Sequence, residues 1–263
     1  MNEIAQYYTA VPDRDRLKTG WGQLELVRTQ ELLLRYLAPP PARVLDVGGG
    51  AGIYSEWLGG LGYEAHLADL TPKHIEQARA ECKHLASAEA ADARALPFPN
   101  EWCDAVLLLG PLYHLQERED RLAALREAAR VLRPGGVLFA AGISRFAGLI
   151  DGLYLKFFED PAFREIIDKS LGDGRHSNPT GRPEYFTTAF FHRPKDLREE
   201  VEAAGVRVEV LVGLEGPGWL PPNFEEIWKD AGRRAHLVDL VRRVEAEESL
   251  LGMSQHLLAV ARK

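Results

Sequence analysis

The stretch that decides the fold is "ARVLDVGGGAGIYSEWL", residues 42 to 58, which places four glycines within five positions. An apolar run precedes the glycines and an amphipathic run follows them, as expected where a strand turns into a helix. Because glycine leaves the backbone bare, the turn can be tight and a ligand can approach the free amides at the helix N-terminus. The sequence therefore predicts a ligand-binding turn rather than a plain connection.

Two phosphate-binding patterns do not fit the spacing of these glycines. The dinucleotide pattern needs a small residue three places after Gly50, where Ile53 stands, and no Gly-Lys-Ser/Thr of a P-loop is present. A nicotinamide-dependent dehydrogenase is therefore the disfavoured alternative. Asp69 lies about 20 residues beyond the loop, where an acid binds ribose hydroxyls in nucleotide-binding α/β folds. Asp69 thus indicates a ribose in the ligand.

Composition limits the class of partner. The chain has 263 residues, 46% of them hydrophobic, and a formal net charge of -7, which disfavours a nucleic-acid surface. The two cysteines, Cys82 and Cys103, form no CxxC pair, and no His/Asp/Glu cluster has metal-ligand spacing, so we expect no metal and no disulfide. No run approaches the roughly 18 apolar residues of a membrane span. We expect a cytoplasmic protein without a membrane or nucleic-acid partner, and a homodimer is compatible with these features.

The chain is expected to form one domain over residues 1–263. From Ala42 onward, strand-like and helical runs alternate, which is typical of a parallel sheet built from βαβ units. A long helix is expected at 224–249 and a last strand at 255–263. The predicted parts are a helical N-terminal cap at 1–40, a cofactor-binding core at 41–146, a lid insertion at 147–195 and the C-terminal part of the sheet at 196–263.

The lid insertion follows the fifth predicted strand, "VLFAAGIS". It begins with a helical stretch at 149–171 and continues as a loop at 172–194 that is dense in glycine, proline and aromatic residues. A loop of this length inside a compact domain is usually functional or disordered. We expect its aromatic residues to line an apolar or flat substrate pocket, with core packing as the alternative.

Five motifs in order resemble those of the class I S-adenosylmethionine-dependent methyltransferases that act on small molecules. They cover residues 42–143 and read "VLDVGGGAG", "LADL", "AADARALPF", "EWCDAVLLLGPLYHL" and "EAARVLRPGGVLFAA". The resemblance implies an α/β, Rossmann-like, doubly wound sheet of seven strands, mostly parallel with an antiparallel last strand. It also implies S-adenosyl-L-methionine as the cofactor.

The same resemblance assigns roles around the cofactor. It implies that Asp46 orients the glycine loop, that Asp69 binds both ribose hydroxyls and that Leu70 lies beside the adenine. The remaining implied contacts are the methionine moiety for Gly48, Gly50 and Gly52, the adenine edge for Asp92 and Ala93, and the methionine amine for Gly110. At the N-terminus, Tyr8 and Arg28 are expected to close the site, and Arg28 could pair with the methionine carboxylate.

Methyl transfer requires alignment of the acceptor and exclusion of water more than covalent help from the protein. A base is needed only where the acceptor must lose a proton. Tyr113 and His114 directly follow the fourth predicted strand, at the sheet edge where open α/β sheets bind ligands. His114 is the predicted base or orienting donor, with Tyr113 beside it and His192 from the lid as a second polar contact.

The sequence thus predicts methyl transfer to an oxygen, nitrogen or carbon atom of a small-molecule acceptor. Two alternatives remain open at this stage. One is a protein that binds the cofactor without turnover, and the other is an RNA or protein methyltransferase. The chain lacks the Asn/Asp-Pro-Pro-Tyr of enzymes that methylate amino groups of DNA and protein, since "GPLYHL" stands there instead.

Overall fold

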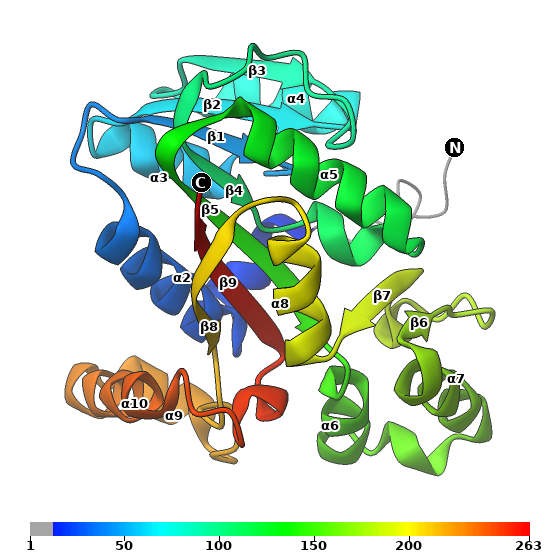
Figure 1. Ribbon diagram of the computed structural model, residues 1–263. Helices are drawn as coiled ribbons and strands as arrows, with labels where there is room; N and C mark the ends of the chain where they lie inside the picture. The colour runs from blue at the N-terminus through cyan, green and yellow to red at the C-terminus, as the bar shows by residue number, and fades with distance from the viewer. Residues whose placement is uncertain (1–12) are drawn as a thin grey trace. The chain divides into compact units, whose positions relative to one another are not determined.

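The computed structural model describes residues 13–263 (Figure 1). The contacts between residues divide this part of the chain into two compact units. We call them the sheet unit, comprising residues 33–142, 196–210 and 259–263, and the helical unit, comprising the described residues up to 32 with 143–195 and 211–258. The chain passes between the units after residues 32, 142, 195, 210 and 258. That the units act as one domain stays a prediction.

Five parallel strands form the frame of the sheet unit, in the order β3-β2-β1-β4-β5. Residues of β4 are almost all apolar and buried, as expected for a central strand covered on both faces. The order reverses between β1 and β4, so the carboxyl ends of these two strands mark the switch point at which open α/β sheets bind ligands. The strands are β1 Arg43–Val47, β2 Glu64–Asp69, β3 Ser87–Ala90, β4 Cys103–Leu108 and β5 Leu132–Ser144.

The last strand, β9 (His256–Arg262), lies between β5 and β8 (Arg207–Gly213). The Gly135 amide donates to the Lys263 carbonyl at 3.0 Å, and the Lys263 amide donates to the Gly136 carbonyl at 3.1 Å. At the other end of β5 the Ser144 amide donates to the Gln255 carbonyl at 2.9 Å, so the two strands run in opposite directions. The predicted mostly parallel sheet with an antiparallel last strand is confirmed.

Helices of the sheet unit follow its strands as the alternating pattern predicts. Pro72 opens α4 and Thr71 precedes it, and proline is favoured at the first position of a helix. The helix α5 buries a face of apolar residues that includes Leu122, Leu125 and Ala128. The helical elements are α3 Ile53–Gly60, α4 Pro72–Glu81, η2 Pro111–His114, α5 Arg118–Val131 and α8 Pro194–Glu202.

The helical unit contains the N-terminal helices and two later groups. Its apolar cluster joins Leu24 of α2 to Phe224 and Trp228 of α9 and to Val238 and Val241 of α10. No helix between residues 13 and 263 is both long and apolar enough to cross a lipid bilayer. The elements are η1 Asp13–Lys18, α2 Gly22–Tyr36, α6 Ala147–Tyr154, η3 Phe157–Glu159, α7 Pro161–Asp173, η4 Pro183–Tyr185, α9 Phe224–Lys229, α10 Ala231–Val244 and η5 Leu251–Met253.

Part of the predicted aromatic loop is strand. Residues Arg175–His176 form β6 and Ala189–His192 form β7, which pair antiparallel, and β7 also pairs parallel with Ile143 and Ser144 at the end of β5. The described chain therefore has these two short strands beyond the seven predicted. Tyr185 packs in the core with Phe163, because its ring finds more burial there than in a solvent-facing loop.

The single helix predicted over 224–249 is wrong. The chain breaks between α9 and α10 at Asp230, whose side chain accepts a hydrogen bond from the Arg233 amide at 2.8 Å. An aspartate in this position satisfies an otherwise unpaired amide at a helix start. The apolar spacing continues across the break, which is why periodicity alone did not indicate it.

Candidate cofactor-binding and active site

The glycine loop joins β1 to α3 within the sheet unit. Gly48 has a φ of +70°, and a Cβ atom added there would lie 2.5 Å from the Pro111 ring. A Cβ at Gly49 would lie 2.4 Å from Oδ2 of Asp46. Both glycines are required by the packing of the protein itself, because real Cβ atoms do not approach neighbours so closely.

Gly50 differs from its neighbours in the loop. A Cβ atom added there would meet nothing within 4 Å, although its φ of +58° also favours glycine. Its amide donates a hydrogen bond to Oδ2 of Asp69 at 2.9 Å. The loop is therefore open on the side of Gly50 and is tied at the same residue to the end of β2.

Asp69 ends β2 and is 7% exposed. Its Oδ1 accepts hydrogen bonds from the Thr71 amide at 2.8 Å and from the His74 ring at 3.1 Å. Burial works against ionisation, but His74 and the Thr71 amide outweigh it and hold the pKa of Asp69 below its ordinary value. Leu70, the next residue, is 63% exposed and so presents an apolar side chain directly beside this carboxylate.

Asp46 lies buried beneath the glycine loop. Its Oδ2 accepts a hydrogen bond from the Ser55 hydroxyl at 2.6 Å, which ties β1 to the first turn of α3. Burial raises the pKa of Asp46 to about 6, and the nearby charge of Asp69 adds to the effect. This geometry fits the predicted role of orienting the loop, with Ser55 as the intermediary.

The loop after β4 packs directly on the glycine loop. A Cβ atom at Gly110 would lie 2.9 Å from the Gly48 carbonyl oxygen, so these two backbones approach each other closely. Tyr113 and His114 follow in η2, with ring centroids 4.6 Å apart in an edge-to-face arrangement. The predicted cofactor loop and the predicted reaction residues therefore belong to one structural unit.

A buried ion pair holds the chain just beyond His114. Arg121 of α5 donates to the carbonyl oxygens of Leu115 and Gln116, both at 2.8 Å. Its guanidinium also forms two parallel hydrogen bonds with Glu200 of α8, at 2.8 and 2.7 Å. Because a paired guanidinium keeps a fixed orientation, these contacts fix the loop that carries His114.

Asp92 and Ala93 lie after β3, where the resemblance predicts contact with adenine. Arg94 donates to both carboxylate oxygens of Asp92, with the shortest distance 2.6 Å, and also to Asp120 at 3.0 Å. Hydrogen bonds from Arg94 hold the pKa of Asp92 below its ordinary value. An adenine contact would therefore share the Asp92 carboxylate with Arg94, and Ala93 beside it is half-buried.

Two other predicted site residues, Arg28 and His192, belong to the helical unit. Arg28 is fully buried in α2 and donates hydrogen bonds to Glu31 and Glu245 of the helical unit. His192 is fully buried in β7, with its ring 4.8 Å from that of Phe190. Tyr8 lies outside the described residues. The roles predicted for these three residues stay predictions.

Residues 45–140 match the family model described as "Methyltransferase domain". Over these residues the chain is therefore similar to methyltransferase domains. A ubiquinone biosynthesis O-methyltransferase of Xanthomonas campestris pv. campestris is 37% identical over 116 residues, covering 41% of this chain and 46% of that protein. The chain thus spans about half the length of this relative. The protein of the same name from Xanthomonas axonopodis pv. citri is 29% identical over 193 residues, or 70% of each chain.

Solved structures with this fold include methyltransferases and an enzyme with a different activity. An S-adenosylmethionine-dependent methyltransferase from Mesorhizobium loti aligns with a TM-score of 0.62 at 18% identity, over 91% of this chain and 100% of the other. The [4+2]-cyclase SpnF aligns with a TM-score of 0.58 at 18% identity, over 93% and 84%. These neighbours confirm the fold of the methyltransferase domain, whereas activity must be argued from the site.

S-adenosylmethionine is the cofactor of this class, and the methyltransferase domain fits it on three counts. The loop is open at Gly50, where a chain of the methionine type needs room. Oδ2 of Asp69 accepts one hydrogen bond and keeps a lone pair for a hydroxyl donor. Leu70 exposes an apolar surface next to that carboxylate, as a flat base requires.

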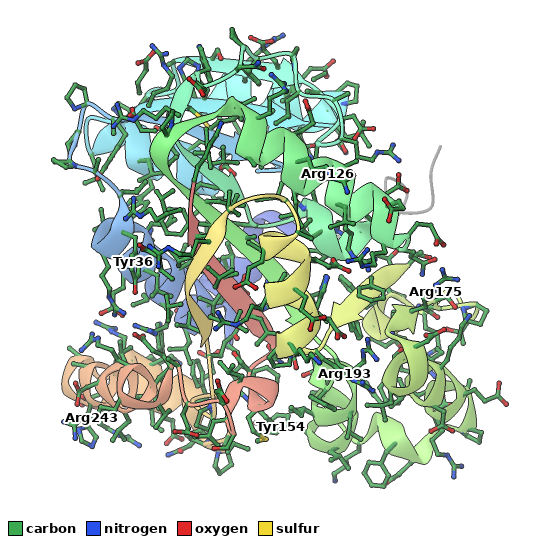
Figure 2. The ribbon with its side chains drawn as sticks, viewed as in Figure 1. Tyr36, Arg126, Tyr154, Arg175, Arg193 and Arg243 are labelled. Atoms are coloured by element: carbon green, nitrogen blue, oxygen red, sulfur yellow. The ribbon has the colours of Figure 1, made fainter. Side chains whose placement is uncertain are left out.

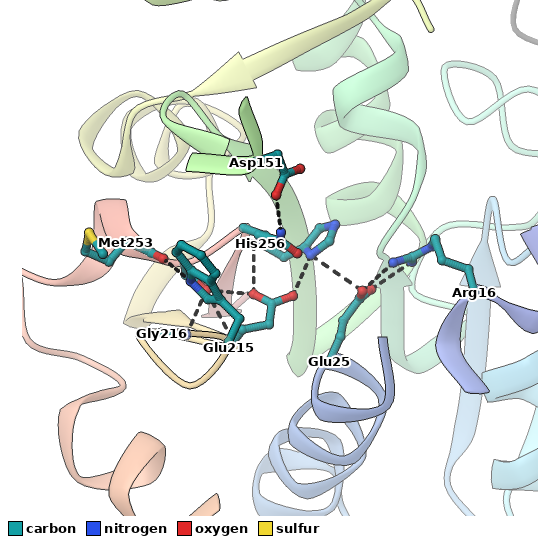
Figure 3. A network of polar contacts seen from close by, with 10 residues as sticks. Arg16, Glu25, Asp151, Glu215, Gly216, Met253 and His256 are labelled. Atoms are coloured by element: carbon teal, nitrogen blue, oxygen red, sulfur yellow. Dashed lines mark hydrogen bonds and ion pairs between the residues drawn. The ribbon is translucent and has the colours of Figure 1, made fainter. Parts of the chain in front are cut away.

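A polar cluster of the helical unit was missed by the sequence analysis (Figure 3). Glu25 of α2, Glu215 after β8 and His256 at the start of β9 bring three possible metal-ligand atoms within 4.8 Å of one another. Burial opposes the charged form of His256, but the charges of Glu25 and Glu215 outweigh it and raise its pKa to about 8. The three residues are far apart in sequence, so ligand spacing could not have indicated them.

Proposed function

We propose that this chain is an S-adenosylmethionine-dependent methyltransferase with a small-molecule acceptor. The observation that carries the proposal is the tie between Asp69 and the glycine loop through the Gly50 amide, at 2.9 Å. It places an ionised carboxylate and an open stretch of backbone side by side at the end of the sheet. A plain connection between a strand and a helix needs neither feature.

Different residues of the domain would bind the cofactor and act on the acceptor. When bound, the cofactor supplies an activated methyl group for in-line displacement by the acceptor. Asp69 and the glycine loop would hold it, and Asp46 would keep the loop in place through Ser55. His114, fixed by the contacts of Arg121 further along the chain, would orient the acceptor or take its proton.

A small acceptor is favoured over a nucleic acid by the charge of the chain. The formal net charge is -7, and the exposed residues Arg126, Arg175 and Arg243 lie on three different elements, α5, β6 and α10 (Figure 2). Nucleic-acid surfaces depend instead on gathered positive charge. The names of the Xanthomonas relatives make an oxygen acceptor the first class to test. A cytoplasmic location and a homodimer stay predictions.

The first test is calorimetric titration of the full chain with S-adenosylmethionine, S-adenosylhomocysteine and NAD. We expect micromolar affinity for the first two and none for NAD. The variant Asp69→Ala should weaken binding at least about tenfold, because a hydrogen bond to a charged group contributes roughly 1.5–3 kcal/mol. Glu64→Gln, at the half-buried beginning of the same strand, is the matched control and should bind as the parent does.

The second test separates binding from turnover. His114→Ala should leave cofactor affinity within about twofold and lower the turnover of phenol, amine and carbon-acid acceptors, since removing an acid–base group costs about 10²–10⁴-fold. Unchanged turnover would exclude His114 as the base. Binding of the cofactor with no product from any acceptor would instead support a protein that binds without catalysis. Binding of NAD alone would refute the proposal.

A further inference from the structure

We infer that Glu25, Glu215 and His256 form a binding site for a divalent transition-metal ion in the helical unit. Nδ1 of His256 lies 2.6 Å from Oε1 of Glu215 and 3.5 Å from Oε2 of Glu25. Figure 3 shows the three side chains converging from α2, the segment after β8 and β9. At 2.6 Å a proton lies between Nδ1 of His256 and Oε1 of Glu215, and a metal ion that displaced this proton would find a lone pair on each of the three ligand atoms.

The distances suit one small cation. Ions of the zinc type bind nitrogen and carboxylate oxygen at about 2.0–2.2 Å, which places tetrahedral ligand atoms roughly 3.3–3.5 Å apart. The separation of His256 Nδ1 from Glu25 Oε2 already has this value. The separation from Glu215 Oε1 would widen by less than about 1 Å when the ion replaces a proton.

Neighbouring groups hold the two carboxylates in position. Oε2 of Glu215 accepts hydrogen bonds from the Ser254 hydroxyl at 2.7 Å and from the His256 amide at 3.0 Å, which leaves Oε1 directed at the imidazole. Arg16 pairs with both oxygens of Glu25. Partners of this kind orient metal ligands and fix their geometry.

The donor set and its burial decide the class of ion. Glu215 is 1% exposed and Glu25 is 8% exposed, and two buried carboxylates require compensating positive charge. Arg16 supplies one charge, and Asp151 brings a further carboxylate into electrostatic range of His256 and Glu215. One imidazole nitrogen with two carboxylate oxygens suits Zn²⁺, Mn²⁺ or Fe²⁺ and is too small a set for Ca²⁺.

The test measures metal binding by the full chain after treatment with a chelator. Equilibrium dialysis against Zn²⁺ and Mn²⁺, followed by elemental analysis, should give one ion per chain. Glu215→Gln and His256→Gln should each weaken binding at least about 100-fold, because removal of a direct ligand exceeds the 10–100-fold effect of an outer partner. His84→Gln is the matched control, since His84 pairs with one carboxylate, Glu56, at 2.8 Å.

A thermal readout keeps the test decisive if a variant folds poorly. Zn²⁺ should raise the melting temperature of the parent and of the His84→Gln variant, and it should not raise that of the conservative Glu25→Gln variant. Absence of bound metal in the parent would overturn the inference. A proton on His256 would then be the charge that compensates the two carboxylates. Equal binding by the parent and both ligand variants would overturn it as well. Neither outcome bears on cofactor binding, which is measured separately.

Discussion

Replacing Glu200 by alanine should destabilise the protein more than any loss of a surface ion pair. Arg121 is 2% exposed and Glu200 is 4% exposed, and two hydrogen bonds of 2.7 and 2.8 Å join them. Glu200→Ala removes the carboxylate that forms two hydrogen bonds with this buried guanidinium. Breaking a buried pair in this way costs about 3–5 kcal/mol. The bonds of Arg121 to the carbonyl oxygens of Leu115 and Gln116 supply no full negative charge.

Urea unfolding of the full chain, followed by far-ultraviolet circular dichroism, would measure the change in the free energy of unfolding. Glu202→Ala is the matched control on α8, because Glu202 is exposed and pairs only loosely with Arg198, at 3.9 Å. Its loss should be below about 1 kcal/mol. The double variant Arg121→Met with Glu200→Leu removes both charges and should recover most of the stability lost by Glu200→Ala.

The comparison between the two single variants can refute this reasoning. If Glu200→Ala lowers the free energy of unfolding no more than Glu202→Ala does, burial of the guanidinium carries no penalty here. If the double variant is less stable than Glu200→Ala, the hydrogen bonds of Arg121 to the loop matter more than its charge. In that case the contacts with Leu115 and Gln116 are what hold the segment after His114.

Three further predictions concern single side chains. Gly49→Ala should cost about 1–3 kcal/mol in urea unfolding, because the new Cβ would lie 2.4 Å from Asp46, and a neutral result would contradict the tight packing of the loop. Burial raises the pKa of Asp46 from 3.8 to about 6, so the protonated carboxyl group stabilises the folded state in full below pH 3.8. This stabilisation, roughly 3 kcal/mol in all, should be lost as pH rises from 3.8 to 6. Asp46→Asn should abolish this slope, and an unchanged slope would assign it to another group. Tyr185→Phe removes a 2.8 Å hydrogen bond to Asp160 and should lower the melting temperature by an amount equivalent to about 0.5–1.5 kcal/mol, whereas no change would show that water replaces the hydroxyl equally well.

Features fixed by neighbouring residues could be predicted from the sequence. The glycine loop, the acid at the end of β2 and the start of α4 at Pro72 each depend on a few adjacent residues with strong backbone preferences. The parallel sheet follows from the alternation of apolar and amphipathic runs. Prediction from the sequence therefore succeeded for features that depend on adjacent residues.

Features that depend on contacts between distant segments could not be predicted. Glu25, Glu215 and His256 meet only because α2, the end of β8 and the start of β9 come together in the folded chain. The sequence suggested Arg28 as a partner for the methionine carboxylate. In the structure Arg28 pairs with Glu245, which lies 217 positions further along the chain. A sequence indicates that a charged side chain exists, whereas its partner depends on tertiary structure.

The repeated passage of the chain between its two units has a practical consequence for fragment design. Both units are assembled from three separate stretches, so no single cut releases either of them as one continuous piece. A fragment limited to residues 45–140 would leave β5 without its neighbour β9 and would expose a strand edge prone to aggregation. Minimal expression fragments, split reporters and domain exchanges based on the recognisable motif region should therefore yield insoluble material.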